Sequence, residues 1–337
     1  MQAVILAGGL GTRLRPLTYA RPKALLPLLN KPLILHLLDH LPASVDHVLL
    51  AANYKVDQLR DFVRARDFGR TVTIVQEKKA LGTGGAIKNL EDQLSGTFLA
   101  FNGDIVSSLA VGDLVAAHRR FGGVATVALW EVDDPSGFGV VAMKDDRITR
   151  FVEKPAKEEA PSKFANAGAY VLEPEVLAAM KPGAEASLER DVFPKVVRQG
   201  LFGFRFSGYW SDVGTRENFL NATRILLREQ GTDVSLRASF GANATYVKPV
   251  AVAAGTVVHG KIGPFVVLGR DCAIGGARVR DSVLFDRVVV GDGAEITGSL
   301  VGDGCRIGVR AKIEDAILED GVVVRAEERV EGGRVRR

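Results

Sequence analysis

A cluster of glycine and basic residues follows the first apolar run of this chain and has the composition of an anion-binding loop. The stretch AVILAGGLGTRLRPLTYARPKALLP places Gly8, Gly9 and Gly11 directly after the apolar run, then Arg13 and, between prolines, Lys23. Backbone N–H groups of a glycine-rich turn can cradle phosphate oxygens, and fixed guanidinium and ammonium groups neutralise their charge. The sequence therefore predicts a site for a polyphosphate, with Arg13 and Lys23 as its cations.

Two familiar phosphate loops do not fit this stretch. The dinucleotide-binding pattern needs a third glycine where Leu14 stands, and the P-loop needs a Gly-Lys-Ser/Thr sequence that the stretch lacks. A glycine-rich segment can also be no more than a tight turn, and arginine and lysine are usually solvated surface residues. The combination with two cations in a proline-stiffened segment favours a different phosphate-containing ligand.

Two aspartates stand where a metal ion could be held. Asp104, in FNGDIV, follows the apolar run TFLAF, and Asp212 lies in GYWSDVG. If TFLAF is a strand of a parallel sheet, Asp104 projects from its carboxyl end, the edge at which such sheets bind ligands. The alternatives are that Asp104 caps the next turn and that Asp212 caps the helix expected after it.

The composition is that of an ordinary globular protein. The 337 residues are 47% hydrophobic and 25% charged, and the net charge of +4 is spread along the chain without a basic run mixed with aromatics, so a nucleic acid polymer is not an expected partner. There is no run of eighteen apolar residues and no signal peptide pattern, so we expect no membrane partner and a cytoplasmic location. Cys272 and Cys305 lack neighbours at metal-ligand spacing and are expected to be buried small hydrophobes.

Alternating strands and helices are predicted for the first part of the chain. The candidate strands are 4–6, 48–51, 72–75, 98–101, 125–129, 139–143 and 169–172. Apolar residues at helical spacing predict helices at 33–41 behind Pro32, at 56–63 and at about 215–229. This order predicts an α/β domain over residues 1–229, with helices on both faces of a doubly wound, mostly parallel sheet.

A six-residue repeat follows. Aliphatic-glycine pairs recur at Ile262-Gly263, Leu268-Gly269, Ile274-Gly275, Val290-Gly291, Val301-Gly302 and Ile307-Gly308. One hexapeptide per face is the pattern of a parallel β-helix, with three hexapeptides to a coil and about four coils over residues 246–325. We therefore expect a linker at 230–245 between the α/β domain and the repeats, and a frayed charged tail at 326–337.

The motifs together resemble those of the sugar-1-phosphate nucleotidyltransferases, the nucleotide-sugar pyrophosphorylases. LAGGLGTRLRPLTYARPKALLP looks like the signature of that family, and FNGDIV, FGVV, FVEKP, NAGAYVL and GYWSDVGTRENFL follow in the family's order before the hexapeptide repeats. The resemblance covers nearly the whole chain. It implies a Rossmann-like catalytic domain of the nucleotide-diphospho-sugar transferase type at 1–229, followed by a left-handed parallel β-helix.

The resemblance also implies a reaction and its catalytic residues. A sugar 1-phosphate attacks the α-phosphate of a nucleoside triphosphate in line, giving an NDP-sugar and pyrophosphate with the help of Mg²⁺. By this resemblance, Asp104 and Asp212 hold the Mg²⁺. Arg13 stabilises the triphosphate and the leaving pyrophosphate, and Lys23 contacts the reacting phosphates.

Two sets of binding residues follow from the same resemblance. The nucleotide set is Leu6, Ala7, Gly8, Gly9, Gly11, Thr12, Arg13, Lys23, Gln76, Gly82 and Thr83. The sugar-phosphate set is Gly139, Glu153, Lys154 and Asn166. Glu153 would accept hydrogen bonds from sugar hydroxyls and Lys154 would grip the sugar phosphate, whereas a Glu-Lys pair before proline is otherwise commonly a surface turn.

By the same resemblance, Gln76 and a loop at residues 80–87 read the base. The loop sequence ALGTGGAI resembles the Gly-Thr-x-Gly loop of guanylyltransferases that act on mannose or heptose 1-phosphate, although Gly84 replaces the alanine common in the mannose enzymes. PKALLP is closer to the thymidylyl and uridylyl branches. GTP and mannose 1-phosphate are therefore the expected substrates. The alternatives are a glucose-1-phosphate thymidylyl- or uridylyltransferase and a heptose-1-phosphate guanylyltransferase.

Two further classes of protein remain as alternatives. A non-catalytic regulatory subunit would have lost the catalytic acids and cations, which this sequence retains. An acyltransferase with His259 as general base would need a longer stack of coils.

The exposed ends of the coil stack present unpaired strand edges, so a homo-oligomer is expected.

Overall fold

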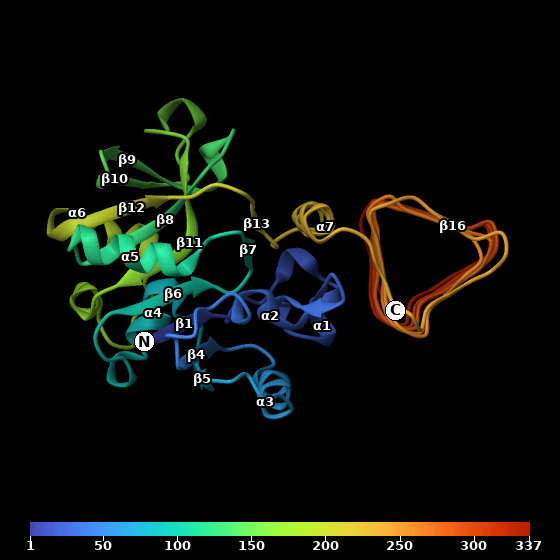
Figure 1. Ribbon diagram of the computed structural model, residues 1–337, viewed down its shortest axis with the longest axis horizontal. Coiled ribbons are helices and arrows are strands. Elements are labelled where there is room, and N and C mark those ends of the chain that lie inside the picture. Colours follow the sequence, from blue (N-terminus) through green and yellow to red (C-terminus); the bar gives the residue numbers. More distant parts are fainter. The chain divides into compact units, whose positions relative to one another are not determined.

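Contacts within the chain divide it into two compact units. The computed structural model describes residues 1–337. The first unit, here the sheet unit, comprises Met1–Gly9 and Leu37–Trp210, and the second, here the coil unit, comprises Leu10–His36 and Ser211–Arg337 (Figure 1). The glycine-rich stretch is therefore divided, with its first two glycines in the sheet unit and its cations in the coil unit.

A mixed sheet forms the core of the sheet unit. Its nine strands run in the order β5-β4-β1-β6-β11-β8-β12-β10-β9. Their bounds are β1 (Gln2–Leu6), β4 (His47–Ala52), β5 (Thr71–Gln76), β6 (Phe98–Asn102), β8 (Ala125–Glu131), β9 (Gly139–Lys144), β10 (Arg147–Glu153), β11 (Phe164–Leu172) and β12 (Leu201–Arg205). Every strand predicted for this unit is present, whereas β10 and β12 are not anticipated by the sequence pattern.

The sheet is parallel in its first half and mixed in its second. β5, β4, β1 and β6 pair in parallel, as do β8 and β12. The other pairs are antiparallel. The expectation of a mostly parallel sheet therefore holds for the first half alone. In the second half β9 and β10 are joined by two residues, and Asp145 there has a φ of 56°, which is the short connection of an antiparallel hairpin.

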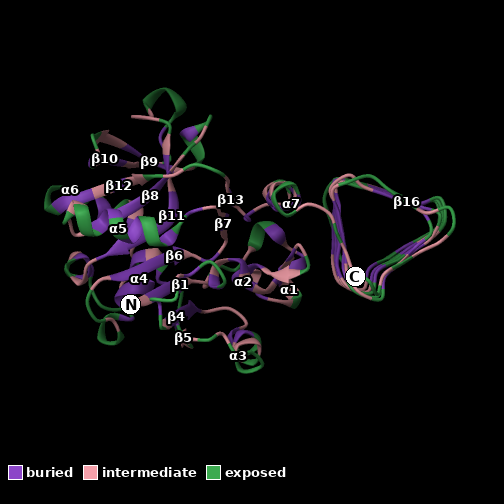
Figure 2. Ribbon diagram, in the orientation of Figure 1, coloured by how far each residue is buried: buried purple, intermediate pink, exposed green.

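Helices and short turns complete the sheet unit. The longer elements are α3 (Val56–Arg64), α4 (Gly82–Lys88), α5 (Val111–Phe121) and α6 (Phe193–Gly200), and the shorter ones are β7 (Ile105–Ser107), a π turn at Leu188–Val192 and 3₁₀ turns at Glu91–Gln93, Pro135–Gly137, Lys157–Glu159 and Pro174–Ala179. Phe98, Tyr170 and Phe193 are fully buried in the core, and Figure 2 shows strands of the sheet such as β6 and β8 mainly as buried. None of the helices in the chain combines the length and apolar character needed to span a membrane.

Residues 80–87 are predicted to form a loop that reads the base. The prediction of a loop is wrong, because most of these residues belong to the helix α4. Glycine disfavours helices by about 1 kcal/mol relative to alanine, but tertiary packing overrides that preference here. A Cβ built on Gly85 would lie 2.5 Å from the carbonyl oxygen of Ala184, and one on Gly84 would lie 3.2 Å from that of Ala186. The glycines therefore allow the helix to approach the backbone that leads into the π turn.

We expect Gly85→Ala to lower the midpoint of thermal unfolding. The added methyl group would meet main-chain atoms, and overpacking of this kind costs about 1–3 kcal/mol, more than the gain in helix propensity. The matched control is Gly112→Ala in α5, where a Cβ would meet no atom within 4 Å. That change should leave stability equal or raise it by up to about 1 kcal/mol. Equal midpoints for the two variants would contradict the packing argument.

The coil unit begins with a short segment of helical turns and a hairpin. The elements of this segment are 3₁₀ turns at Thr12–Leu14 and Lys23–Leu25, α1 (Leu17–Ala20), and the strands β2 (Pro27–Leu28) and β3 (Lys31–Pro32). The long helix α7 (Arg216–Gln230) also belongs to the coil unit. Two elements, α2 (Leu33–Leu38) and β13 (Trp210–Asp212), cross the boundary between the units. The helix predicted at 33–41 is thus shorter than its apolar pattern suggests, whereas the one predicted at 215–229 is confirmed as α7.

Three parallel sheets make up the rest of the coil unit, here the three-sheet domain, which has a triangular outline in Figure 1. The first sheet contains β14 (Asp233–Val234), β17 (Val250–Val252), β20 (Val266–Leu268), β23 (Ser282–Leu284), β26 (Leu300–Val301), β29 (Ile317–Leu318) and β32 (Arg334–Val335). The second contains β15 (Ser239–Phe240), β18 (Val257–Val258), β21 (Ala273–Ile274), β24 (Val289–Val290), β27 (Arg306–Ile307) and β30 (Val323–Val324). The third contains β16 (Thr245–Tyr246), β19 (Lys261–Ile262), β22 (Arg278–Arg280), β25 (Glu295–Thr297), β28 (Lys312–Glu314) and β31 (Arg329–Glu331).

Each coil contains fewer residues, and the stack contains more coils, than the hexapeptide pattern predicts. Val250 pairs with Val266, 16 residues along, and Val283 pairs with Leu300, 17 residues along, whereas three full hexapeptides would give about 18. The sheets contain seven, six and six strands, more than the expected four coils. Segments 230–245 and 326–337, expected as a linker and a frayed tail, also hold paired strands. These segments lack the aliphatic-glycine pattern, but their backbone groups form hydrogen bonds with the neighbouring coils, and they therefore become strands of the three sheets.

Aliphatic side chains fill the three-sheet domain. Ile274, Val290 and Ile307 are buried on successive strands of the second sheet. The expectation that both cysteines are buried is confirmed, and their thiols donate to the carbonyl oxygens of Phe285 and Glu319, both at 3.0 Å. Burial raises the pKa of the Cys272 thiol to about 11 and that of Cys305 to about 12.

Candidate active site

In the sheet unit, the first glycines follow the central strand β1. Leu6 ends β1, and the Ala7 N–H donates to the Ala51 carbonyl at the carboxyl end of β4. The Gly103 N–H donates to the Leu6 carbonyl at 3.0 Å, and a Cβ on Gly103 would lie 2.8 Å from that oxygen. Gly103 therefore has to be glycine for the chain to pass this close, and it delivers Asp104 at the end of β6, as predicted.

Two buried amide oxygens lie at the same edge of the sheet without a hydrogen-bond partner. They are Oδ1 of Asn53, which follows β4, and Oδ1 of Asn102, the last residue of β6. β4 and β6 flank β1 in the sheet, and the Asn53 side chain lies 3.5 Å from where a Cβ on Gly8 would be. Unsatisfied buried acceptors are rare in native proteins and mark places where a ligand or water completes the bonding. The motif analysis misses Asn53, although its position after a strand is a usable signal.

Glu77 lies closer to the glycine loop than the predicted base reader Gln76. Its Oε1 lies 3.3 Å from the position of a Gly8 Cβ, and its Oε2 accepts a hydrogen bond from the Leu81 N–H at 3.2 Å. Burial raises the pKa of the Glu77 carboxyl, although the Leu81 hydrogen bond opposes this. The Gln76 side chain is exposed and accepts from Arg60 at 3.0 Å. Glu77 is therefore a functional candidate that the sequence analysis does not name.

A second residue outside the predicted set, Glu189 in the π turn, joins the two predicted binding sets. Glu189 accepts hydrogen bonds from the Thr83 hydroxyl at 2.9 Å and from the Tyr170 hydroxyl at 2.9 Å. Asn166 donates to Tyr170 at 2.8 Å and to Glu189 at 3.4 Å. Thr83 of the nucleotide set and Asn166 of the sugar set are thus brought to one carboxylate. No spacing rule in the sequence could connect residue 189 with residues 83 and 166.

Glu153, at the end of β10, faces Gly139, at the start of β9. Its Oε2 lies 2.6 Å from where a Cβ on Gly139 would be, so a side chain at 139 would displace the carboxylate. Burial, and secondarily the negative charge of Glu189, raises the pKa of Glu153. Lys154 has a φ of 48° and its ammonium lies 3.9 Å from Glu153 Oε1. The predicted sugar-phosphate residues 139, 153 and 154 are therefore neighbours, and Glu189 lies near enough to affect them electrostatically.

If Glu153 binds the sugar phosphate, as the motif predicts, its raised pKa predicts a pH dependence of that binding. An ionised carboxylate accepts hydrogen bonds from hydroxyls more strongly than a neutral one, and this group takes up its proton at a higher pH than an ordinary glutamate. As pH falls from 7, KM for the sugar phosphate should begin to rise earlier than for an unperturbed carboxyl. The substrate phosphate itself titrates near pH 6, so its protonation also changes KM. The comparison is therefore with Glu153→Gln, which keeps the effect of substrate protonation and loses the effect of Glu153 protonation. Identical KM profiles for both proteins would contradict the prediction.

In the coil unit, the third glycine and both predicted cations lie in the same short segment. Gly11 has a φ of 60°, a left-handed conformation, and precedes the 3₁₀ turn that carries Thr12 and Arg13. A Cβ on Gly11 would lie 2.7 Å from the Thr18 methyl group and 3.3 Å from Lys23 Cβ. Glycine at this position therefore satisfies both the backbone and the packing. Lys23 begins the next 3₁₀ turn, directly after Pro22.

Asp212 lies close to Arg13. A Cβ on Gly214 would lie 2.6 Å from Arg13 Nη2 and 2.8 Å from Asp212 Oδ2, so both groups border the space that this glycine leaves open. The Asn218 side-chain amide donates to Asp212 Oδ1 and orients the carboxylate. The N-cap of α7 is Thr215, whose hydroxyl accepts from the Asn218 N–H, so Asp212 does not cap that helix. The structure therefore places Lys23 beside Gly11 and Asp212 beside Arg13.

Two family models together match most of the chain. Residues 2–229 match the nucleotidyl transferase family, and residues 243–336 match the GMPPB C-terminal domain. This chain belongs to the nucleotidyl transferase family.

Relatives of similar length carry a more specific description. The mannose-1-phosphate guanylyltransferase of Mycobacterium tuberculosis is 37% identical over 298 residues, which is 86% of this chain and 81% of the relative. The mannose-1-phosphate guanyltransferase of Saccharomyces cerevisiae is 36% identical over 255 residues, 72% of this chain and 69% of the relative. A solved structure of a putative glucose-1-phosphate thymidylyltransferase from Bacillus anthracis is similar with a TM-score of 0.60 and 28% identity, covering 66% of this chain and 93% of that chain. These likenesses agree with a Rossmann-like nucleotidyltransferase fold for the first part of the chain.

Proposed function

We propose that this protein is a mannose-1-phosphate guanylyltransferase, which joins GTP and mannose 1-phosphate to give GDP-mannose and pyrophosphate. The observation that carries the proposal is the 37% identity to such an enzyme over 86% of the chain. The retention of every predicted catalytic residue supports it, because a non-catalytic subunit has no need of Arg13, Lys23, Asp104 and Asp212 together. In the family the nucleotidyl group passes directly between phosphates, and we propose the same here.

The chemistry requires charge neutralisation more than nucleophilic activation. A phosphate oxygen of the sugar 1-phosphate forms a bond to the α-phosphorus, while the bond from that phosphorus to the bridging oxygen breaks and pyrophosphate leaves. Both reactants are anions, so groups that offset negative charge lower the barrier. We assign Arg13 to the leaving pyrophosphate and Lys23 to the reacting phosphates. Gly8, Gly9 and Gly11 would bind the triphosphate through the main chain.

We propose that Asp104 in the sheet unit and Asp212 in the coil unit are ligands of Mg²⁺, as the family resemblance implies. Carboxylate oxygens are the hard ligands that this ion prefers, with water in its remaining positions. Asn218 fixes the orientation of Asp212, and Gly103 fixes the course of the chain before Asp104. When bound, the ion would offset the negative charge of the triphosphate and of the leaving group.

The sugar and the base are assigned to residues of the sheet unit. Glu153 would accept hydrogen bonds from sugar hydroxyls, and Lys154 would bind the sugar phosphate, as expected from the sequence. Glu189 is a further candidate, because it bonds both Thr83 and Asn166 directly. Guanine has N–H donors at N1 and N2, and a carboxylate such as Glu77 is suited to accept hydrogen bonds from them.

The three-sheet domain is proposed to be a left-handed parallel β-helix that mediates self-association. The stacked strands at intervals of 16 and 17 residues support the β-helix, and the unpaired edges of its first and last coils support association. Sedimentation over a range of protein concentrations tests this, and a single monomer mass at all concentrations would oppose it. A cytoplasmic location stays a prediction.

A pyrophosphate-release screen tests the proposed function. The four common ribonucleoside triphosphates and deoxythymidine triphosphate are paired with the 1-phosphates of mannose, glucose and a heptose. The pair GTP and mannose 1-phosphate should give the highest kcat/KM. Preference for thymidine or uridine triphosphate with glucose 1-phosphate would favour the alternative to which the Bacillus anthracis structure points, and no release from any pair would oppose catalysis.

A further inference from the structure

Residues 10–36, which carry both proposed catalytic cations, pack against the coils of the three-sheet domain within the coil unit. Arg21, two residues before Lys23, forms ion pairs with Asp303 at 3.0 Å and with Asp320, and its side chain is 18% exposed. These two aspartates stand on successive coils, and each carboxylate is fixed by a main-chain donor. Asp303 Oδ1 accepts from the Asp286 N–H at 3.0 Å, and Asp320 Oδ1 accepts from the Asp303 N–H at 2.9 Å. A half-buried arginine between two fixed carboxylates is a rigid anchor for the Lys23 end of the segment.

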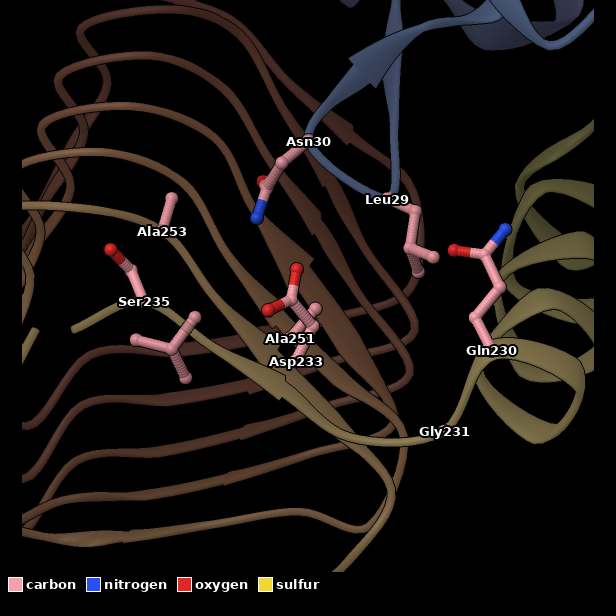
Figure 3. Close-up of a pocket in the computed structure, with 9 residues that line it drawn as sticks. Leu29, Asn30, Gln230, Gly231, Asp233, Ser235, Ala251 and Ala253 are labelled. Atoms are coloured by element: carbon pink, nitrogen blue, oxygen red, sulfur yellow. The ribbon is translucent and has the colours of Figure 1, made fainter.

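The hairpin that follows is attached as well. The turn between β2 and β3 is formed by Leu29 and Asn30, both with positive φ. Asn30 Nδ2 donates to the Leu268 carbonyl at 3.0 Å, and Figure 3 shows the Asn30 side chain directed at the coil strands. A cavity of about 150 Å³ beside this contact is lined by Asn30, Gln230 and Asp233 among others.

The Arg13 end of the segment is held by the last coil. Gly332 and Gly333, with φ of 67° and 81°, turn the chain into β32. There Arg334 Nη2 donates to the main-chain carbonyl of Arg13 at 2.9 Å. Two residues on, the Arg336 guanidinium donates to the Tyr19 hydroxyl and lies 4.8 Å from the centre of its ring.

A cavity of about 360 Å³ adjoins this end of the segment in the coil unit. Arg13, Arg216, Asp315 and Arg334 contribute to its walls. Arg216 is already bonded to Asp315 and Glu217, so it is not available to hold the Arg13 main chain. The Arg334 hydrogen bond therefore holds this end of the segment, as the Arg21 ion pairs hold the other end.

We propose that Arg334 is a positioning residue that keeps the Arg13 turn in its reactive conformation from the last coil of the three-sheet domain. This rests on the proposed function for its effect on rate, but not for its effect on structure. Arg334 touches the main chain of Arg13 and leaves the guanidinium to the substrate. A fixed guanidinium stabilises charge that develops on a leaving group without having to be reoriented during the reaction.

The test compares Arg334→Ala, Arg334→Lys and the control Arg329→Ala in the full-length protein. Arg329 is exposed on β31 of the same last coil. Arg334→Ala should lower kcat about three- to tenfold, the range that the loss of one hydrogen bond gives. KM for the sugar phosphate should stay within about twofold. Arg334→Lys should recover part of the rate because an ammonium can still donate, and Arg329→Ala should behave as wild type.

Hydrogen–deuterium exchange supplies a readout that needs no substrate. Peptides covering residues 12–20 should exchange faster in Arg334→Ala than in wild type or Arg329→Ala, with an unchanged midpoint of unfolding. Unchanged exchange in these peptides would overturn the proposal whatever the substrates prove to be. Faster exchange with unchanged kcat on the preferred substrate pair would overturn the catalytic part, and equal losses in the two alanine variants would show a general effect of the last coil.

Discussion

Arg13→Ala is expected to lower kcat by two to three orders of magnitude and to leave the fold intact. The side chain is exposed, so its removal should change the free energy of unfolding by less than about 0.5 kcal/mol. A preorganised cation at a leaving group is worth about 3–4 kcal/mol of transition-state stabilisation, as for other groups that stabilise developing negative charge. The measurement is steady-state pyrophosphate release with saturating GTP and mannose 1-phosphate.

The controls for this prediction separate charge from geometry. Arg306→Ala removes another exposed arginine of the coil unit and should leave kcat unchanged. Arg13→Lys keeps the positive charge but loses the planar fork that binds two phosphate oxygens at once, so it should fall between alanine and wild type. An Arg13→Ala enzyme with at least a third of the wild-type kcat would remove Arg13 from the mechanism.

Asp104→Asn is expected to reduce turnover by a factor of about a thousand or more at millimolar magnesium. The asparagine keeps the size and one oxygen of the side chain but loses the charge that holds a divalent cation. Since both substrates are anions, an enzyme without the bound ion faces their full repulsion. Asp212→Asn should have a similar effect, because the same ion is assigned to both residues.

Magnesium titration distinguishes loss of the ion from loss of the fold. If Asp104 is a ligand, a tenfold rise in magnesium concentration should restore part of the activity of Asp104→Asn, whereas it should leave wild type unchanged. Asp133→Asn, at an exposed position of the sheet unit, serves as the control and should behave as wild type. An Asp104→Asn enzyme whose turnover and magnesium dependence match wild type would exclude the metal assignment.

The sequence predicts local structure well where apolar runs are long and bounded by turns. β1, β4 and β6 are examples, since each is a buried run with a glycine or asparagine at its end or within two residues after it. It fails at α4, because the preference of glycine for loops is overridden by the close approach of Gly84 and Gly85 to another backbone segment. That approach depends on contacts with residues a hundred positions away, which a local pattern does not contain.

The candidate site also contains residues that the sequence identifies and residues that only the structure identifies. Of the motif residues, Arg13 and Asp212 border the same space beside Gly214, and Glu153 faces Gly139. Glu77 and Glu189 escape the sequence analysis because neither belongs to a recognisable spacing. Their significance comes from what they touch: Leu81 in one case, and Thr83, Asn166 and Tyr170 in the other. Hydrogen-bond networks between distant segments are visible in three dimensions alone.

The grouping of residues 10–36 with the C-terminal half of the chain has a consequence for protein engineering. A fragment cut at residue 229 would retain the cations but lose the aspartates and the arginine that hold their segment. Chimeras that graft a relative's C-terminal half onto this N-terminal half would inherit the same defect unless acidic groups matched to Arg21 came with it. The smallest portable form of this protein is therefore expected to be the full-length polypeptide.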